Sequence, residues 1–468
     1  MGKHEPWFSL AEIDALDGAN AQGVVSLVRE VDPINPMAWF DAGGMAGFSS
    51  RQFWRNAEDS LTLVGLGAAF RLEGALSASV DLQTQWSCEV GRYAGEATPC
   101  ATGAVALGGF RFADHHCDET HGIWTEWPSG QLVVPQWLLT VTGERAWITL
   151  NQGGLQRLTK VRGPRNQVFE QEQALYSLVS RMQGMDDDVR DRPAIWVGSV
   201  DRELWTKSVD QVAEDIRRQQ LVKVVLARVL EARSTKNWDL SRVVSGLGKN
   251  QAGTYRFAIV NRDQTFLGAT PERLVDYHDG HIATMCLAGS APRGDTIALD
   301  ERLGADLLTD AKNLYEHKIV VDQVSRVVRE LGQRVEISPP ELVRWPDIQH
   351  LRTTIRAVVD KSVSILSLVA RLHPTPAVLG LPEQAAWAEI RRHEKFDRGW
   401  YAGPIGWMDA HGQGEFAVAL RSALLARNQA WLFAGAGLVG QSEGESEFQE
   451  TTWKFNAMLN ALGEVQNG

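Results

Sequence analysis

The sequence has few cysteines for its length, and none of them belongs to a closely spaced pair. Its 468 residues contain four, at Cys88, Cys100, Cys117 and Cys286, and no C-x-x-C spacing occurs. Scattered cysteines of this kind are typical of free thiols in a reducing compartment. The sequence therefore predicts a cytoplasmic location.

Long apolar runs are also missing. No run approaches the roughly 18 residues that a membrane-spanning helix needs. Residues 1–6 lead directly into polar sequence, without the pattern of a secretory signal. We therefore expect no membrane association.

Positive charge is scarce relative to negative charge. The 47 Lys and Arg residues face 58 Asp and Glu residues, which gives a formal net charge of −11. This balance disfavours binding to nucleic acid or to an anionic membrane surface. A small anionic substrate stays possible, because local positive charge or a metal ion can bind it.

What is present indicates a folded α+β protein. Its hydrophobic fraction of 44% and charged fraction of 22% are ordinary for a globular chain. Residues 1–200 contain short β-type runs, with strands predicted at 38–40, 60–65 and 132–134. Residues 201–468 predict a helix over 207–220, hairpin strands between 254 and 287, a turn at 288–294 and a long helix over 300–331. Hairpin-linked antiparallel strands favour an α+β fold over a parallel βαβ array.

Lys223 stands inside an apolar β-type run, LVKVVLAR at residues 221–228. The Val and Leu residues predict a strand that is buried or nearly so. Loss of hydration drives a buried lysine toward its neutral form, which can act as a general base at neutral pH. The alternative is an edge strand from which the lysine extends its ammonium group to water.

Residues 435–440, GAGLVG, match the G-x-G-x-x-G pattern of dinucleotide-binding loops and stand between a predicted strand and a predicted helix. Residues 441–468 are too few for the helix, second parallel strand and ribose-binding acid of such a site. The acidic residues that come next would also repel a pyrophosphate at the helix N-terminus. We expect these glycines to let backbone N–H groups approach a different anion.

Glu447 and Glu450 are three residues apart, so they share one face of the predicted helix, and Lys454 lies one turn beyond Glu450. Charge pairing on a helix surface is one interpretation of this pattern. A hard-cation site is the other, because carboxylates with open coordination positions suit Mg²⁺.

Ten motifs in a fixed order resemble those of the chorismate-utilising enzymes, and most closely the isochorismate synthase branch, over residues 200–465. They are KVVLAR at 223–228, TPERL at 270–274, LAGSAPR at 287–293, EH at 316–317, QHL at 349–351, HPTPAV at 373–378, DRGWYAG at 397–403, ALRS at 419–422, GAG at 435–437, and Glu447 with Glu450. The long first part resembles the menaquinone-type enzymes of this branch.

The resemblance implies one fold, in which two large, mostly antiparallel sheets pack together with helices outside. Residues 1–200 are then a divergent N-terminal part of the same compact body, and residues 201–468 the chorismate-binding catalytic region. A monomer or weak homodimer is expected.

The resemblance also implies the reaction, a Mg²⁺-dependent, reversible conversion of chorismate to isochorismate by water. Branches that add ammonia resemble one another in having Gln where this chain has Lys223, and those that build aminodeoxychorismate have Lys where it has Ala288. Two alternatives stay open: a salicylate synthase, which eliminates pyruvate after the same first step, and an inactive regulatory homologue.

The resemblance assigns roles to particular residues. Lys223 is the base and Glu272 the acid, which must be protonated at rest. Mg²⁺ is bound by Glu316 and Glu450, with Glu447 nearby, and Arg421 suits the enolpyruvyl carboxylate. The implied substrate-binding positions are Gly289, His350, Ala377, Arg421, Gly435, Gly437 and Lys454.

Overall fold

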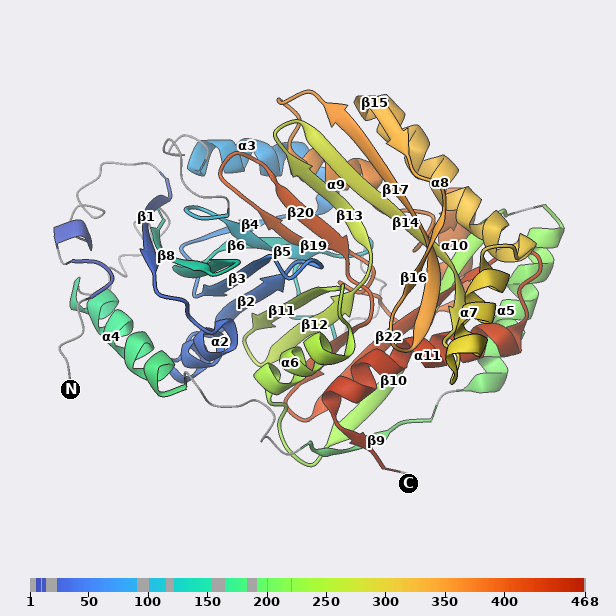
Figure 1. The fold of residues 1–468 in the computed structure, drawn as a ribbon, viewed down its shortest axis with the longest axis horizontal. Coiled ribbons are helices and arrows are strands. Elements are labelled where there is room, and N and C mark those ends of the chain that lie inside the picture. Colours follow the sequence, from blue (N-terminus) through green and yellow to red (C-terminus); the bar gives the residue numbers. More distant parts are fainter. Residues whose placement is uncertain are drawn as a thin grey trace.

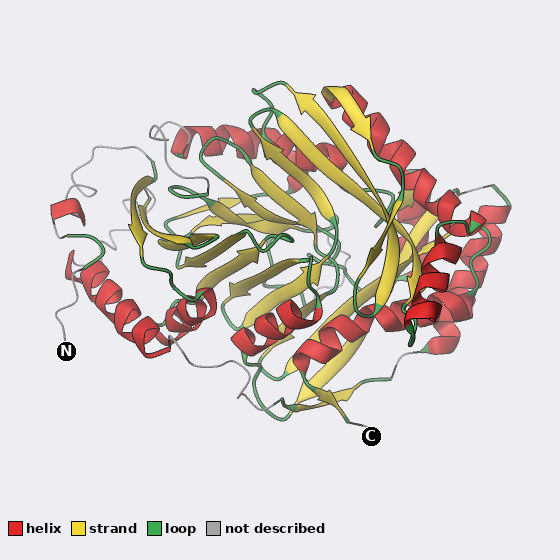
Figure 2. Ribbon diagram, in the orientation of Figure 1, coloured by secondary structure: helices red, strands yellow, loops and turns green. Residues whose placement is uncertain are grey.

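The computed structural model describes residues 6–9, 11–13, 23–90, 101–114, 122–153, 165–182, 192–199, 201–219 and 221–466. Two large β-sheets dominate the molecule, with helices around them (Figures 1 and 2). All strand pairs are antiparallel except that of β9 with β23, among the strands described. The predicted α+β fold of two packed, mostly antiparallel sheets is confirmed.

The larger sheet has 13 strands and draws on both the first 200 residues and the rest of the chain. Its order is β1 (Val25–Val31), β8 (Arg145–Gln152), β7 (Trp137–Thr142), β3 (Leu61–Leu66), β2 (Ser50–Arg55), β11 (Tyr255–Asn261), β12 (Gln264–Thr270), β21 (Ser422–Ala426), β22 (Gln429–Leu438), β10 (Lys223–Ser234), β9 (Ala194–Val197) and β23 (Glu464–Val465), with β18 (Gly380–Leu381) on β10.

The smaller sheet has ten strands and mixes both parts of the chain in the same way. Its order is β15 (Gly332–Ile337), β17 (Ile348–Val359), β14 (His281–Pro292), β13 (Arg273–His278), β20 (Gly414–Val418), β19 (Pro404–Met408), β5 (Ala106–Phe110), β6 (Gly130–Val134) and β4 (Phe70–Glu73), with β16 (Glu341–Arg344) on β17.

Helices surround the sheets (Figure 1). They are α2 (Pro36–Met45), the short 3₁₀ helix η1 (Leu76–Ala78), α3 (Ser79–Glu89), α4 (Arg165–Met182), α5 (Arg202–Arg217), α6 (Leu240–Asn250), α7 (Ile297–Leu307), α8 (Ala311–Leu331), α9 (Ile365–Leu372), α10 (Glu383–His393) and α11 (Gly444–Leu462). Helix α8 packs on β14 and β17 of the smaller sheet, whereas α11 packs on β22 of the larger sheet and on helices α5 and α6.

Two apolar cores hold these layers together. The first includes Leu138 of β7 and Phe416 of β20, and it extends to helices α8 and α9 through Val324 and Leu368. The second lies between the larger sheet and its helices, and includes Leu139 of β7 and Phe455 of α11. The neighbours Leu138 and Leu139 enter different cores because successive strand side chains point to opposite faces. Burial on both faces explains why the strands read as continuous apolar runs.

Local capping explains where two sequence predictions are wrong. The strand predicted at 38–40 lies inside helix α2, because Asn35 caps that helix by accepting from the N–H groups of Met37 and Ala38, and Pro36 occupies its first turn. The helix predicted over 300–331 is divided into α7 and α8, and Asp310 caps the second by accepting from the N–H of Asn313. The strands predicted at 60–65 and 132–134 are confirmed as β3 and β6.

Two further expectations from the sequence concerned membrane-spanning helices and free cysteines. No helix among the described residues is both long enough and apolar enough to span a bilayer. Cys88 and Cys286 are free cysteines, the first exposed and the second buried. Cys100 and Cys117 lie outside the described residues.

Candidate active site

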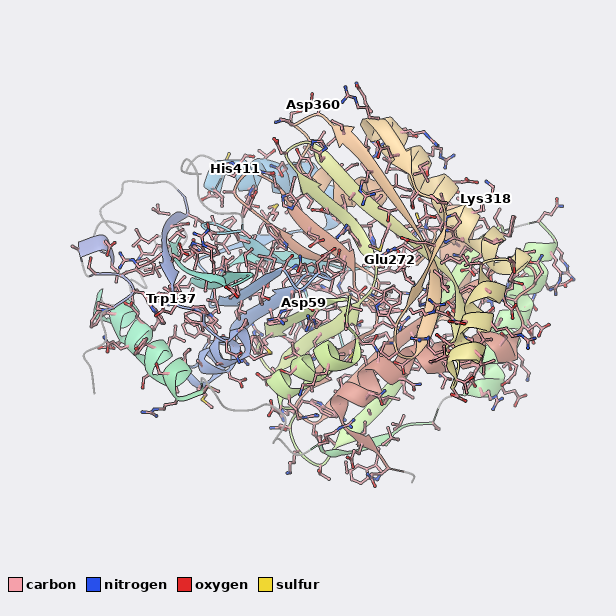
Figure 3. The ribbon with its side chains drawn as sticks, viewed as in Figure 1. Asp59, Trp137, Glu272, Lys318, Asp360 and His411 are labelled. Atoms are coloured by element: carbon pink, nitrogen blue, oxygen red, sulfur yellow. The ribbon has the colours of Figure 1, made fainter. Side chains whose placement is uncertain are left out.

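A cavity of about 80 Å³ lies where the two sheets meet, and many of the predicted site residues line its wall. They are Glu272, Gly289, Glu316, His350, Ala377, Arg421, Gly435, Gly437, Glu450 and Lys454. Figure 3 shows Glu272 near the centre of the molecule, where the two sheets approach each other. Lys223 and Glu447 are not among the lining residues, but they contact residues beside the cavity.

Glu272 lies between β12 and β13, in the link from the larger sheet to the smaller one. Its side chain is buried, and the residue is only 3% exposed. Burial raises the pKa of the Glu272 carboxyl to about 8, although Lys223 and Lys454 act in the opposite direction. Glu272 is therefore protonated at neutral pH, which is the state that a general acid requires.

Lys223 is the first residue of β10 and is 1% exposed. It pairs with Leu381 of β18, and the next residue, Val224, pairs with Leu438 of β22. This position is inside the sheet, so Lys223 is not an edge-strand lysine that reaches water. Its ammonium group instead lies 3.0 Å from Oε1 of Glu316.

The GAGLVG motif does not form a loop at a helix N-terminus. Gly435 and Gly437 lie inside strand β22, antiparallel to β10, and the next helix begins only at Gly444. A Cβ atom on Gly437 would lie 2.3 Å from Oε1 of Glu316 and 3.0 Å from Cε of Lys223. The glycine therefore leaves space for the buried Lys223–Glu316 pair, and the dinucleotide interpretation does not fit this strand.

Three carboxylates on two helices meet three lysines beside the cavity. Glu316 of α8 pairs with Lys223. Glu447 of α11 accepts from Lys312 of α8 at 2.9 Å. Glu450 of α11 accepts from Lys454, one turn further along, at 2.6 Å, and Lys454 also donates to the backbone oxygen of Gly435 at 2.9 Å. Each carboxylate thus has its own ammonium partner.

The charges of this cluster are strongly coupled. Burial, and then the neighbouring Glu450, raise the pKa of Glu447 above its usual range. Burial opposes ionisation of Glu450, but Lys454 and Lys312 lower its pKa overall. The pKa of Lys312 is raised by Glu447, Glu316 and Glu450 against the effect of burial, so this ammonium group lies within the field of all three carboxylates.

The donor chemistry of the three carboxylates fits a hard cation such as Mg²⁺, which prefers carboxylate oxygens and keeps open positions for water or substrate. A finished ligand cluster is not formed: among the residues that the structure describes, no three His, Cys, Asp or Glu side chains are arranged to hold a metal ion. Each of the three carboxylates contacts a lysine in this structure.

Arg421 is buried in the cavity wall at 6% exposure, and its backbone has a φ of 47°, a left-handed value that a non-glycine residue rarely adopts. Its Nη2 donates to Nε2 of His350 at 2.9 Å. Burial lowers the pKa of Arg421 to about 10, so the guanidinium remains charged at neutral pH. No Asp or Glu oxygen among the described residues lies within ion-pair distance of it. A buried cation with a neutral partner is suited to binding a carboxylate.

Residues 288–292 of the turn predicted at 288–294 instead belong to strand β14, which contains a β-bulge between Ala288 and Ser290. Gly289 occupies the bulge with a φ of 78°, and a Cβ there would lie 3.2 Å from Cβ of Asn313. The bulge turns this part of the strand toward the cavity. Ala288 beside it is buried and has no nucleophilic group.

The model of the family described as "Chorismate binding enzyme" matches residues 11–463 of the chain. The chain belongs to this family. The match covers most of the first 200 residues as well as the region of the cavity.

Two relatives match the chain over nearly their full length. Isochorismate synthase MenF of Bacillus subtilis (strain 168) is 35% identical over 453 residues, covering 94% of this chain and 93% of the relative. The salicylate biosynthesis isochorismate synthase of Pseudomonas aeruginosa is 34% identical over 457 residues, covering 94% and 90%.

Solved structures of the family share the fold. An isochorismate synthase of Bacillus anthracis, DhbC, superposes with a TM-score of 0.71 at 26% identity, covering 91% of this chain and 99% of that one. The menaquinone-specific isochorismate synthase MenF of Escherichia coli gives a TM-score of 0.74 at 24% identity, covering 96% and 98%.

Three residues in or beside the cavity had no assigned role in the sequence. Arg398 donates to the backbone oxygens of Val225 and Val378, both at 2.8 Å, and so fixes two segments of the cavity wall. Arg398 belongs to the DRGWYAG motif. That motif indicated that the residue lies near the site, but it did not indicate which atoms Arg398 contacts. Lys312 had the weaker signal of standing one helical turn before Glu316. Ser290, in LAGSAPR, is the third such residue.

Proposed function

We propose that the protein is an isochorismate synthase, which converts chorismate to isochorismate by adding water at ring carbon 2 as the carbon 4 hydroxyl departs. The observation that carries the proposal is that a lysine, Lys223, and a carboxylic acid, Glu272, are both buried beside the same cavity. The two are buried near one cavity, they belong to different elements, and Glu272 is protonated at neutral pH. The full-length similarity to isochorismate synthases supports the same conclusion.

Water is the nucleophile that these residues favour. A buried lysine at position 223 can accept a proton from water. Ala288 provides no side-chain amine for a covalent attack on the ring, so an aminodeoxychorismate-type reaction lacks its nucleophile. Family branches that use ammonia resemble one another in having Gln at the position of Lys223.

The proton balance follows from the two groups. Lys223 acts as the base in its neutral amine form, so the proton of the Lys223–Glu316 ion pair has to leave first. The amine then removes a proton from water as the oxygen bonds to ring carbon 2, and the ring double bonds shift. The bond between carbon 4 and its hydroxyl breaks, and Glu272 donates its proton so that the hydroxyl leaves as water. The reaction leaves Lys223 protonated and Glu272 ionised. A proton transfer through solvent restores both, so nothing is gained or lost overall.

Charged side chains orient the substrate between base and acid. Arg421 binds the enolpyruvyl carboxylate, because its guanidinium is buried and has no carboxylate partner among the described residues. Glu316 and Glu450, with Glu447 nearby, would hold Mg²⁺. The bound ion would neutralise the ring carboxylate of the substrate and hold it in place.

Product analysis tests this proposal directly. The purified protein is incubated with chorismate and Mg²⁺, and the products are separated by chromatography. Isochorismate without pyruvate is the expected result. Salicylate with an equal amount of pyruvate would replace the proposal with a salicylate synthase. Unchanged chorismate would indicate an inactive regulatory homologue.

A further inference from the structure

Ser290 occupies a position between the two groups that would bind the two ends of the substrate. It comes directly after the β-bulge of β14 and lines the cavity. Its Oγ lies 3.0 Å from Nδ1 of His350, and its hydroxyl also hydrogen-bonds to the Glu450 carboxylate. On the far side of the imidazole, Arg421 contacts Nε2 at 2.9 Å. The four side chains form one continuous chain of hydrogen bonds.

The direction of every bond in this chain is determined by chemistry. A guanidinium has donors and no acceptor, so Nε2 of His350 must accept from Arg421 and cannot have a proton. A neutral imidazole has one N–H, which is then on Nδ1. That N–H can donate to Oγ of Ser290 at 3.0 Å and to the backbone oxygen of Gly289 at 3.3 Å. The Ser290 hydroxyl, having accepted, is free to donate to the Glu450 carboxylate.

We propose that Ser290 is a positioning residue: it fixes His350 as the neutral Nδ1–H tautomer, whose Nε2 then holds the Arg421 guanidinium toward an anionic group of the substrate. This role rests on the proposed function only in the identity of that anion. This series of hydrogen bonds begins at the Arg421 cation and ends at the Glu450 carboxylate. Each donor along it is therefore polarised in the same direction.

The surroundings of His350 are consistent with this role. The residue is 6% exposed, and burial, followed by the charge of Arg421, lowers the pKa of His350 well below its usual value. Protonation of Nε2 would place a donor against the donor of Arg421 and displace the guanidinium. His350 is therefore a neutral acceptor that orients Arg421, and it is not a proton donor to the departing hydroxyl.

The tautomer can be measured without substrate. Histidine labelled with ¹⁵N is incorporated into the full chain, and the His350 signals are assigned by comparison with a His350→Gln variant. The expected result is a protonated Nδ1 and an unprotonated Nε2 throughout the range between about pH 5 and 8. A protonated Nε2, in either the neutral or the charged ring, would overturn the proposal.

Kinetics of two Ser290 variants test the effect on binding. Ser290→Ala removes the acceptor at 3.0 Å and leaves only the Gly289 oxygen. The KM for chorismate should therefore rise about five- to tenfold, as for loss of one hydrogen bond. The kcat should stay within about twofold, because the change affects ground state and transition state alike. Ser290→Thr keeps a hydroxyl and should restore the KM of the unmodified protein.

Ser325→Ala is the matched control, because Ser325 is a buried serine of α8 whose hydroxyl has no hydrogen-bond partner among the described residues. It should leave the tautomer and the KM unchanged. Equal KM values for Ser290→Ala and the unmodified protein would overturn the proposal, as would a Ser290→Ala variant that loses only thermal stability. If the unmodified protein leaves chorismate unchanged, the proposed reaction fails, and the ¹⁵N measurement repeated on Ser290→Ala still tests the role of Ser290: the Nδ1 signal of His350 should shift, and an unchanged spectrum would overturn the proposal.

Discussion

Nζ of Lys223 lies 3.0 Å from Oε1 of Glu316, so the proposed base and a proposed metal ligand form a buried ion pair. Removing one member of such a pair leaves an uncompensated charge in the interior. Because Glu316 contacts Lys223 and would also bind the cation, binding of a cation at Glu316 should change the protonation state of Lys223.

Turnover should depend on Mg²⁺. Excess chelator should abolish isochorismate formation, and Glu316→Gln or Glu450→Gln should abolish it at all Mg²⁺ concentrations, because each removes a carboxylate that would hold the ion. Initial rates and calorimetric Mg²⁺ titrations provide the measurement. Asp322→Asn, an exposed carboxylate on the same helix as Glu316, is the control and should behave like the unmodified protein. Full activity in chelator would contradict the metal site.

Replacing the acid or the base should remove most of the activity. Glu272→Gln, Lys223→Ala and Lys223→Gln should each lower kcat by about two to four powers of ten, the usual contribution of a positioned acid or base. Lys223→Gln keeps a hydrogen-bond donor for Glu316 and separates the loss of the base from the loss of the hydrogen bond to Glu316. Circular dichroism should show a retained fold, and Lys361→Ala, at an exposed site, serves as the control. Near-normal kcat in any of the three variants would contradict the assigned roles.

The pH dependence of kcat and of stability should follow the titration of Glu272. Because its pKa is raised to about 8, the proton that it donates is present below pH 8 and is lost above it, so kcat should fall as pH rises through 8. The folded state also retains this proton when the unfolded chain, with a glutamate pKa of about 4.3, has lost it. The contribution of Glu272 to stability is therefore lost as pH rises from the unfolded pKa through the folded pKa.

Denaturation of Glu272→Gln at several pH values measures that second effect. The variant should gain stability relative to the unmodified protein as pH rises from the unfolded pKa of about 4.3 to about 8, and the difference should be constant below and above that range. A difference that stays the same at all pH values would mean that the pKa of Glu272 is not raised.

Gly437→Ala should inactivate the protein with little effect on the rest of the fold. The new methyl group would overlap Oε1 of Glu316, 2.3 Å away, and would press on the Lys223 side chain. We expect kcat/KM to fall by at least about tenfold, the result of misplacing a catalytic group. Gly440→Ala, whose Cβ would approach only the Arg217 and Ile216 side chains, is the control. Equal activity of the two variants would show that the space at Gly437 is not required.

The reaction should be reversible. Chorismate and isochorismate differ only in the positions of one hydroxyl and of the double bonds, so their free energies are close, and Lys223 and Glu272 exchange roles in the reverse direction. Incubations that begin with either compound should reach the same ratio, measured by chromatography at the endpoint. Conversion of both to salicylate and pyruvate would contradict the proposed function.

The fold could be predicted because ten ordered motifs resemble those of a known family, and the same motifs hold most of the residues that line the cavity. Strand β10 follows from its run of Val and Leu, and the spaced motifs bring Glu272, Glu316, His350 and Arg421 to one cavity. The strand predicted at 38–40 failed because three apolar residues fit either a strand or a helix, and the capping by Asn35 decided between them.

The partners of the charged groups could not be predicted in the same way. Lys223 pairs with Glu316, and Glu447 with Lys312, across elements that are far apart in the sequence. Spacing along the chain contains no information on such distances. The i, i+4 pair of Glu450 and Lys454 is the exception, because one helix fixes both residues.

The register of β10 against β22 places Val225 opposite Gly437, so the strand that bears the base is paired with one made much later. During synthesis on a ribosome, Lys223 emerges well before Gly437, Glu450 and Lys454 exist. Pairing of such distant segments is slow. Until β22 has been synthesised, the apolar strand β10 lacks its partner and can aggregate. Production of this protein should therefore depend on chaperones that shield a nascent strand, and fragments that stop before α11 should be both inactive and poorly soluble.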